Sequence, residues 1–544
     1  MSEEEHRLTP PGSAALDPAH EGPIRGALGT VPADDAARPR KWSRRLLTLA
    51  AIMGPGLVVM VGDNDAGGVS TYAQAGQDYG ASLLWVLVLL VPTLIVAQEM
   101  VVRLGAVTGV GHARLIKARF GPMWAAFEVG DLVLLNFLTL VTEFIGVDLS
   151  LRYFGITPLA SVPIVALGLL AMVATGSFQR WERFMFVFIV TSLLMFPLAA
   201  LSHPTAGPIL TGLIRPGVKG GFTPTSVLFI IAVVGTTIAP WQLFFQQSNV
   251  IDKRITTRWL KYELADTSIG AVLTVAGAAA LMVGTAFAFS HSGFAGQFGS
   301  GLTVARGLSH QVGSASGAIF AVILLNASVI GASAVTLATS YALGDMFGLR
   351  HSLHRSVRDA KGFYLTFVAL IVVAAAIVLI PGAPLGLMTT GVQVLAGLLL
   401  PAAIVFLLLL CNDAEVLGPW VNSFKQNVAA TVIVSVLVLL SLILTATTIF
   451  PSLPLGLFTG GVVLVGVVGL MWMALTSRRH RSADPERQLS VGGDRHVWRM
   501  PPLDTLKPPA WSRTQLAGML ALRVYLVGAM LLLGLKIGQI ASGH

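Results

Sequence analysis

The sequence predicts an all-α membrane protein with about 12–13 transmembrane helices, of which the first and the sixth are broken. Three observations predict this class. Of the 544 residues, 54% are hydrophobic and only 12% are charged, whereas ordinary soluble domains carry roughly 25% charged residues. Apolar runs long enough to cross about 30 Å of hydrocarbon recur along most of the chain. Finally, positively charged residues gather in alternate loops between these runs.

The residues at 1–45 precede the apolar runs. They are rich in Pro, Ala, Gly and acidic residues and show no apolar period. This composition is typical of a disordered tail. A secretory signal would place its apolar region closer to the N-terminus and would not be followed by further spans. We therefore expect a disordered cytoplasmic tail.

Thirteen apolar runs are expected to cross the membrane. They lie at 46–76, 81–102, 123–147, 158–176, 184–202, 225–248, 267–290, 316–346, 363–381, 387–411, 428–450, 455–476 and 516–538. The first ten form a transporter-like core at 46–411, and 412–476 supplies helices eleven and twelve. A polar cytoplasmic linker at 477–514 separates these helices from 515–544, which holds the candidate for a thirteenth helix.

The distribution of Lys and Arg predicts the orientation in the membrane. Loops on one side carry the basic residues within 103–119, 180–183, 253–261, 350–361, 425 and 478–481. Those on the other side carry Arg152, Arg215, Lys219 and Arg306. Because positive loops stay in the cytoplasm, we expect a multi-pass inner-membrane protein with its N-terminus inside. The same distribution argues against nucleic-acid binding, despite the net charge of +9.

The first run is interrupted at 63–68 by DNDAGG. A carboxylate inside hydrocarbon costs several kcal/mol unless an ion or a partner compensates its charge. Gly67 and Gly68 weaken the helix, so that backbone carbonyls can turn toward a polar ligand. Asp65 is therefore predicted to bind a cation inside the membrane. Asp63 either joins it or faces water at the mouth of the cavity.

The sixth run is interrupted at 235–242 by GTTIAPWQ. Pro240 removes a backbone N–H and clashes with the preceding turn, which leaves the carbonyls before it available to a ligand. The alternative is a proline kink that serves helix packing alone. Interruptions in the first and sixth runs occupy corresponding positions if units of five helices repeat. Such pairs indicate inverted repeats with a substrate site at the bilayer midplane.

Several short motifs follow one another in a definite order between residues 46 and 411. They are Gly54-Pro55-Gly56, Asp65-Ala66-Gly67-Gly68, Gln74-Ala75-Gly76 and the segments 82–87, 103–109, 143–146 and 235–248. In order and spacing these motifs resemble the NRAMP family of divalent-metal transporters. The resemblance implies a LeuT-like fold with two five-helix inverted repeats. It also implies alternating access around a metal ion that is the substrate, with no cofactor.

The resemblance implies a metal site from which two of the three usual side-chain ligands are missing. In the usual members helix one carries Asp-Pro-Gly-Asn and helix six carries Met-Pro-His-Asn, with the Asp, Asn and Met side chains as ligands. Asp65 takes the position of the aspartate. Gly68 replaces the first asparagine, and Ala239 replaces the methionine. Trp241 stands in place of the histidine and Gln242 in place of the second asparagine.

These replacements favour a hard cation. A thioether is a soft ligand that helps a site select transition metals, and Ala239 supplies none. Gly68 and Ala239 leave a wider cavity, in which Asp65 and backbone carbonyls present only oxygen. Mg²⁺ keeps several of its waters in such sites. The pattern is similar to the magnesium-transporting prokaryotic branch of the family, so we expect partly hydrated Mg²⁺ as the substrate and Mn²⁺ as the second choice.

Further polar groups are expected to complete the site, directly or through water. The candidates are the carbonyls of Gly62 and Thr236, the hydroxyl of Thr237 and the amides of Gln242 and Gln393. For each of them the alternative is a hydrogen bond between packed helices.

Proton coupling is expected to be weak or absent. The family pairs acids on helix three with a histidine on helix six. Here Glu143 keeps one acidic position, but Leu140 occupies the neighbouring one. The histidine positions of helix six hold Trp241 and Gln246, which do not titrate near neutral pH and are expected at the cavity or gate. Glu143 remains a relay acid, a gate partner or a structural carboxylate.

Other function classes remain open. They are an ordinary proton-coupled transporter of Mn²⁺ or Fe²⁺, a LeuT-like carrier of an organic solute and a metal-sensing receptor. An enzyme is not expected, because no serine, histidine and acid combination gathers in a soluble domain. The expected partners are the metal ion and the lipid bilayer, and the oligomeric state stays undetermined.

Overall fold

The computed structural model describes residues 20, 22–32, 42–290, 292–293, 295–380 and 385–449, together with 460–461, 498, 500–506 and scattered positions between 516 and 531. The predicted twelfth helix at 455–476, most of the linker at 477–514 and most of the thirteenth run at 516–538 lie outside the described residues.

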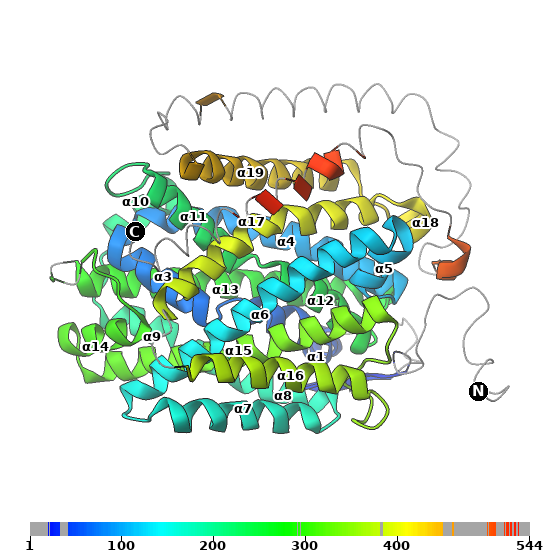
Figure 1. Cartoon of the computed structure of the whole chain (residues 1–544), viewed down its shortest axis with the longest axis horizontal. Coiled ribbons are helices and arrows are strands. Elements are labelled where there is room, and N and C mark those ends of the chain that lie inside the picture. Colours follow the sequence, from blue (N-terminus) through cyan, green and yellow to red (C-terminus); the bar gives the residue numbers. More distant parts are fainter. Residues whose placement is uncertain are drawn as a thin grey trace.

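The described chain is almost entirely helical (Figure 1). Its longer helices are α1 (Trp42–Ile52), α2 (Pro55–Gly62), α3 (Ala66–Tyr79), α4 (Leu84–Thr108), α5 (His112–Phe120), α6 (Pro122–Tyr153), α7 (Pro158–Ala174), α8 (Phe178–Ser192), α9 (Met195–Leu201), α10 (Ala206–Ile214), α11 (Pro224–Thr237), α12 (Pro240–Asp252), α13 (Leu260–Phe289), α14 (Gly301–Gln311), α15 (Ser314–Phe347), α16 (Lys361–Val378), α17 (Leu385–Cys411) and α19 (Phe424–Ile449). Short turns are η2 (Gly80–Leu83), η3 (Thr257–Trp259), α18 (Ala414–Leu417), η4 (Gly418–Trp420) and η6 (Leu503–Thr505). The strands β1 (Ile24–Gly26) and β2 (Gly29–Val31) form an antiparallel hairpin.

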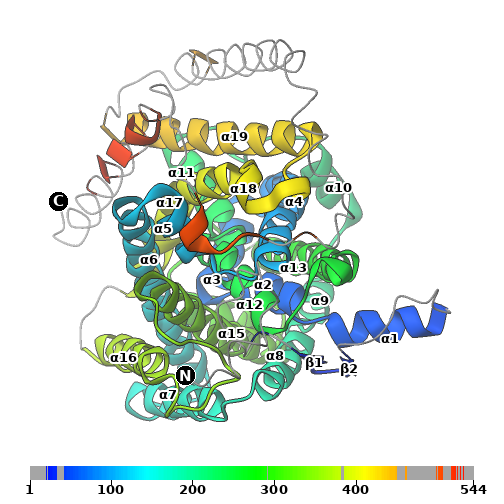
Figure 2. The ribbon, with the colours of Figure 1, turned by 90° about the vertical axis from the view of Figure 1, so that its right-hand side faces the viewer.

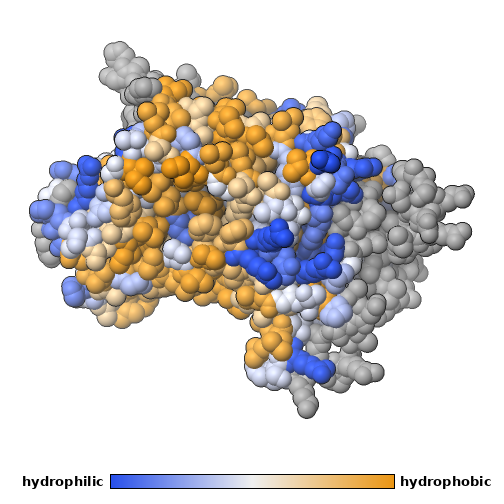
Figure 3. Space-filling model, turned by 90° about the horizontal axis from the view of Figure 1, so that it is seen from below, coloured by the Kyte–Doolittle hydropathy of each residue, from blue (hydrophilic) through white to orange (hydrophobic). Residues whose placement is uncertain are grey.

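The first eleven predicted runs coincide with helices. In order they correspond to α2–α3, α4, α6, α7, α8–α9, α11–α12, α13, α15, α16, α17 and α19. Within the described residues, nine helical segments are long and apolar enough to cross a membrane, or up to ten if the bent pair α1–α2 is counted as one span. The space-filling view shows a broad apolar face with hydrophilic residues toward its two ends (Figure 3). The chain is thus a multi-pass membrane protein.

The first predicted run begins too early. Residues 46–52 belong to α1, which meets α2 at a bend of 51°. Gly54 lies at the bend with φ 151°, a conformation that other residues rarely adopt. Pro55 then begins α2, because a residue without an N–H is tolerated in the first turn of a helix. The first broken helix therefore consists of α2 and α3.

The hairpin lies within the tail that the sequence predicts to be disordered, so that prediction does not hold for residues 22–32. Gln179 Nε2 of α8 donates a hydrogen bond to Gly26 O at 3.0 Å. Ala27 N donates to Glu182 Oε2 at 2.5 Å. Contacts with a helix more than 150 residues away order this segment, and composition alone does not reveal them.

The two broken helices lie at the centre of the bundle. Figure 2 shows α2, α3 and α12 enclosed by α4, α6, α13, α15 and α17. α2 begins next to α1, which packs on the β-hairpin, and Lys253 after the end of α12 contacts the same junction. We call this end of the bundle the hairpin side. The outer helices thus hold two helix breaks in the interior, away from lipid.

Candidate metal site

The breaks in the two central helices meet. α3 begins directly after Asp65, and α11 ends at Thr237. A Cβ atom on Gly68 would lie only 2.9 Å from Thr236 Oγ1. The Tyr72 hydroxyl of α3 lies 2.8 Å from Thr237 Oγ1 of α11. The beginning of one half-helix therefore lies against the end of another.

The first break frees a backbone carbonyl. Asp65 caps α3, and its Oδ1 accepts a hydrogen bond from Gly68 N at 2.6 Å. Ala66 N donates instead to Glu143 Oε2 of α6 at 3.1 Å. In a continuous helix Ala66 N would donate to the carbonyl of Gly62, so the break leaves that oxygen without its helical partner.

The second break frees another carbonyl. Pro240 begins α12 and has no N–H, so the carbonyl of Thr236, four residues earlier, cannot receive a helical hydrogen bond. Ala239 has an extended backbone, with φ −97° and ψ 147°. Its own carbonyl accepts from Gln242 N at 3.1 Å. The oxygen available at this break is thus that of Thr236.

Two carboxylates occupy the first break. Asp63 is 1% exposed and Asp65 is 4% exposed. Within the part of the chain that the structure describes, neither oxygen of Asp63 has a hydrogen-bond partner. None of the ion pairs found among the described residues involves either acid. Because a buried carboxylate is costly without a compensating charge, this arrangement suits a cation.

Buried amide and hydroxyl groups lie beside these carboxylates. Gln242 is fully buried, and both of its amide atoms lack a partner. Gln393 Nε2 of α17 is also without a partner and would lie 1.7 Å from a Cβ atom on Gly67. Thr236 Oγ1 is unpartnered as well. The structure thus brings the predicted Gln242, Gln393 and Thr236 to the breaks.

The available ligands are hard oxygen atoms. Within the described residues, no group of three or more His, Cys, Asp or Glu side chains is arranged to hold a metal ion. A cation at the breaks would therefore bind carboxylate, carbonyl, hydroxyl and amide oxygens. Such ligands suit Mg²⁺ and Mn²⁺. Ala239, which the resemblance aligns with a methionine, contributes no sulfur.

Two of the predicted groups have other partners. The Thr237 hydroxyl donates to Val233 O at 2.7 Å and contacts Tyr72, so its hydrogen bonds hold α11 and α3 together. Gln246 Nε2 donates to Glu263 Oε1 of α13 at 3.0 Å. Gln246 therefore belongs to the contact between α12 and α13, not to the breaks. Tyr72, which sequence reasoning did not single out, is the polar side chain that connects the two half-helices.

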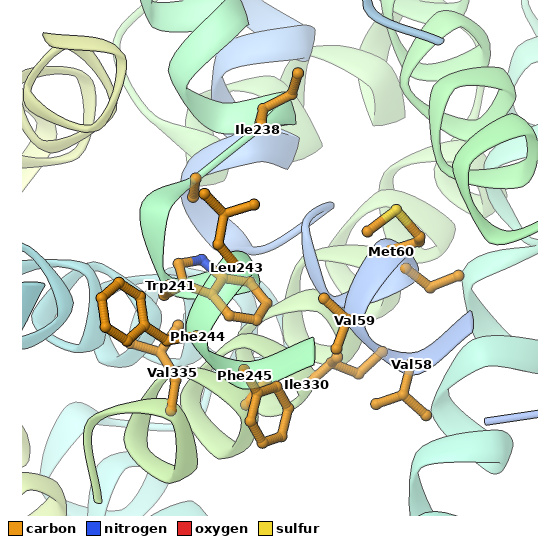
Figure 4. Close-up of a cluster of buried hydrophobic side chains, with 14 of the residues drawn as sticks. Val58, Val59, Met60, Ile238, Trp241, Leu243, Phe244, Phe245, Ile330 and Val335 are labelled. Carbon is orange, nitrogen blue, oxygen red and sulfur yellow. The ribbon is translucent and has the colours of Figure 1, made fainter. Parts of the chain in front are cut away.

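An apolar cluster closes the site toward the hairpin side. Figure 4 shows side chains of α2, α12 and α15 meeting, among them Val59, Trp241, Phe245 and Ile330. Trp241 is buried, and its ring centroid lies 6.2 Å from that of Phe245. It also approaches Gly62, where an added Cβ atom would lie 3.5 Å from the indole. The predicted gate position of Trp241 is thus occupied by a packed aromatic side chain.

A buried ion pair lies beyond this cluster. Lys253 Nζ at the end of α12 lies 2.6 Å from Glu182 Oε1 of α8. It also donates to the carbonyls of Ile52 and Met53, each at 2.7 Å. The sequence assigns Lys253 to a positively charged loop, and no local pattern indicates its burial.

Asp266 of α13 completes this arrangement. Its Oδ2 accepts hydrogen bonds from Gly54 N at 3.0 Å and from Gly56 N at 2.8 Å. A carboxylate at this position satisfies N–H groups that the start of α2 leaves free. We call Glu182, Lys253 and Asp266 the hairpin-side cluster. It fixes the junction between α1 and α2.

A membrane-embedded helical bundle with two opposed helix breaks and buried oxygen atoms beside them is typical of one class, that of transporters with a LeuT-like fold. The model of one family, described as natural resistance-associated macrophage protein-like (Nramp), matches residues 56–447. The chain belongs to the Nramp family.

Relatives and solved structures agree with this assignment. The chain is 26% identical over 409 residues to the divalent metal cation transporter MntH of Klebsiella pneumoniae (strain 342). The aligned region covers 72% of this chain and 92% of that protein. The chain is 27% identical over 268 residues to MntH of Mesorhizobium japonicum, and this alignment covers 46% of this chain and 57% of that protein. A solved structure with a similar fold is the crystal structure of the Eremococcus coleocola manganese transporter in complex with an aromatic bis-isothiourea substituted compound. The TM-score is 0.63 and the sequence identity is 24%, and the match covers 82% of this chain and 99% of that chain. This last likeness shows a shared fold.

Proposed function

We propose that the protein is a secondary transporter that moves divalent metal cations across the membrane by alternating access. The observation that carries this proposal is the pair of buried carboxylates, Asp63 and Asp65, at the break between α2 and α3, with no basic side chain of the described residues paired to either. Membership of the Nramp family and the name of the MntH relatives support the metal class. The protein is not an enzyme, and the metal is its substrate.

Partly hydrated Mg²⁺ is the main substrate in this proposal, and Mn²⁺ is the second. Both cations accept oxygen ligands, but transition-metal selection is helped by a soft ligand that Ala239 lacks. Gly68 contributes no side chain next to Thr236 Oγ1. A hydrated ion binds through fewer protein ligands than a bare one, and this suits a site with two carboxylates and a few neutral oxygens.

Proton coupling is weak or absent in this proposal. Glu143 is fully buried, and its Oε2 accepts a hydrogen bond from Ala66 N. This contact supports the reading of Glu143 as a structural carboxylate that holds the start of α3. On helix six, Trp241 and Gln246 carry no group that titrates near neutral pH. A proton relay needs neighbouring groups that both accept and release protons, and the acid beside Glu143 is Asp65, which this proposal assigns to the metal.

The second candidate is a proton-coupled transporter of a transition metal. It is favoured by the relatives named above, one of which is a manganese transporter. Both candidates place the N-terminus in the cytoplasm of an inner membrane, because the basic loops lie on the hairpin side.

Metal competition in liposomes tests the proposal. Purified protein is reconstituted with an internal dye that responds to Mn²⁺, and Mn²⁺ entry is measured with increasing external Mg²⁺. The expected result is competitive inhibition by Mg²⁺, together with Mg²⁺ entry reported by a second dye. Entry of Mn²⁺ that is insensitive to Mg²⁺ would favour the second candidate. Metal binding without any entry would show a receptor instead of a transporter.

A further inference from the structure

We propose that α1 lies in the surface of the bilayer on the hairpin side and binds the headgroups of anionic phospholipids. α1 has 11 residues, which are too few to cross the hydrocarbon. Figure 2, which looks along the long axis of Figure 1, shows α1 lying across the view and extending outward beyond the bundle. In Figure 1 the helices α7, α15 and α16 run along this long axis, so α1 lies across the direction of these helices.

The two faces of α1 differ. Thr48, Ala51 and Ile52 are buried against the β-hairpin and α13. The large apolar side chains of Trp42, Leu46 and Leu47 are 73%, 49% and 69% exposed. Residues four apart, such as 42 and 46, share one face of a helix. An exposed apolar face on a short helix at the edge of a membrane bundle is typical of an interfacial helix.

The charge of α1 selects the kind of lipid. Arg44 and Arg45 are exposed, and neither takes part in an ion pair within the described residues. The sequence places Arg38, Arg40 and Lys41 directly before the helix. No acidic residue occurs between 36 and 62. A basic segment beside an apolar face matches the negatively charged headgroups of a cytoplasmic leaflet.

Helix α1 is joined firmly to the first broken helix. The last carbonyls of α1 accept hydrogen bonds from Lys253 Nζ. Gly29 of the hairpin comes so close to Ala51 that a Cβ atom there would lie 3.1 Å from the Ala51 Cβ atom. From this junction the eight residues of α2 lead directly to the first break. A lipid bound at α1 therefore stabilises the position of the half-helix that ends at Gly62.

Site-specific fluorescence tests the proposal. Cys411 is the single cysteine and is buried. In a Cys411→Ala background, Leu46→Cys carries an environment-sensitive dye, and the full chain is placed in nanodiscs with headgroup-region spin labels that quench the dye. Val357→Cys is the matched control, because Val357 is also exposed on the hairpin side but lies in a loop between helices. Discs of phosphatidylcholine alone are compared with discs that also contain phosphatidylglycerol.

The expected result is strong quenching at position 46, little at 357, and an increase at 46 when phosphatidylglycerol is present. Arg44→Gln and Arg45→Gln should each lower the ratio of membrane-bound to free α1 by about fivefold in the anionic discs. Three outcomes would overturn the proposal. They are equal water exposure at 46 and 357, insertion that does not depend on lipid charge or on the arginines, and cross-linking between two copies through position 46.

Discussion

Asp65 caps a helix and, in the proposed function, binds the metal ion, and a single substitution can separate these two roles. Its Oδ1 caps α3 through Gly68 N, and its charge faces the break. An asparagine caps a helix about as well as an aspartate but carries no charge. Asp65→Asn should therefore leave the folded protein extractable with its melting temperature nearly unchanged. It should lower metal uptake by about a hundredfold, the upper end of what is lost when even a supporting group of a metal site is removed.

Asp65→Ala should lose both the uptake and part of the stability, because it removes the cap as well. Normal flux through the Asp65→Asn protein in liposomes would remove this residue from the ligand set. Asp63→Asn, measured beside it, reports whether the unpartnered carboxylate of Asp63 also binds the ion.

Substitutions of Ala239 test which metal ion the site prefers. Ala239→Met adds a thioether at the beginning of α12 and should shift the preference toward Mn²⁺ over Mg²⁺ by roughly tenfold, because a soft ligand strengthens transition-metal binding more than Mg²⁺ binding. Ala239→Leu is the matched control, with similar volume and no sulfur. Competition between the two ions in liposomes gives the ratio. An equal shift in both variants would show an effect of volume, and no shift would contradict the oxygen-ligand argument.

The positions of the two helix breaks have local signals, because Pro240 and the Gly67–Gly68 pair mark them in the sequence. Asp65, Thr236 and Gln393 lie near these breaks, and their role as metal ligands stays a prediction. Gln246 has its partner, Glu263, on another helix. Tyr72 likewise shows no local signal for its contact with α11. Long-range hydrogen bonds of this kind depend on packing that local patterns do not encode.

At the scale of elements, one buried charge pair, Lys253 with Glu182, helps to fix the junction of α1 and α2. Lys253→Met leaves Glu182 buried without its partner, and this should lower the free energy of unfolding by about 3–5 kcal/mol. The double variant Lys253→Met/Glu182→Met removes both charges and should recover part of that loss. Thermal unfolding in detergent measures all variants. Additive losses in the double variant would show that the two residues are not coupled.

A buried histidine at the start of α5 predicts how the stability of the protein depends on pH. His112 is buried, and its Nδ1 lies 2.9 Å from Gln247 Oε1 of α12. Burial lowers the pKa of His112 from its ordinary value near 6.5 to about 4. Because the unfolded chain takes up this proton first, stability should fall as the pH drops from about 6.5 toward 4, by about 1 kcal/mol between pH 7.5 and 5.5.

His112→Phe removes this titration and should reduce the difference in melting temperature between pH 7.5 and 5.5. His310→Phe, at an exposed position of α14, is the control and should leave the difference unchanged. An identical pH response in the wild type and in His112→Phe would exclude His112 as a contributor.

The helices themselves were largely predictable, because apolar length is a strong local signal. Eleven predicted runs have helices, and both breaks fall where Gly and Pro interrupt the runs. The separate helix α1 and the hairpin at 22–32 were not predicted. α1 leads into α2 without a polar gap, so its last residues look like the beginning of the first run. The hairpin is ordered by Gln179 and Glu182 of α8.

At the scale of the whole molecule, the transport cycle must move the metal from one side of the apolar cluster to the other. α2 and α12 form the hairpin-side half of both broken helices, and Trp241, Val59 and Phe245 pack between them (Figure 4). Opening toward the hairpin side therefore requires α2 to separate from α12. Lys253, directly after α12, holds the end of α1 just before α2, so we expect its contacts with Ile52 and Met53 to break in that step.

A transport cycle of this kind needs no proton if Asp63 and Asp65 by themselves compensate the charge of the cation. We expect the internal pH of liposomes to stay constant while Mg²⁺ enters, with an ionophore present to remove the membrane potential. A Glu143→Gln variant should keep a substantial rate, since a glutamine oxygen can still accept the hydrogen bond from Ala66 N. Acidification that follows Mg²⁺ entry and disappears in Glu143→Gln would instead identify Glu143 as a proton carrier. The argument from Trp241 and Gln246 would then fail, because one buried acid would be enough to couple the two fluxes.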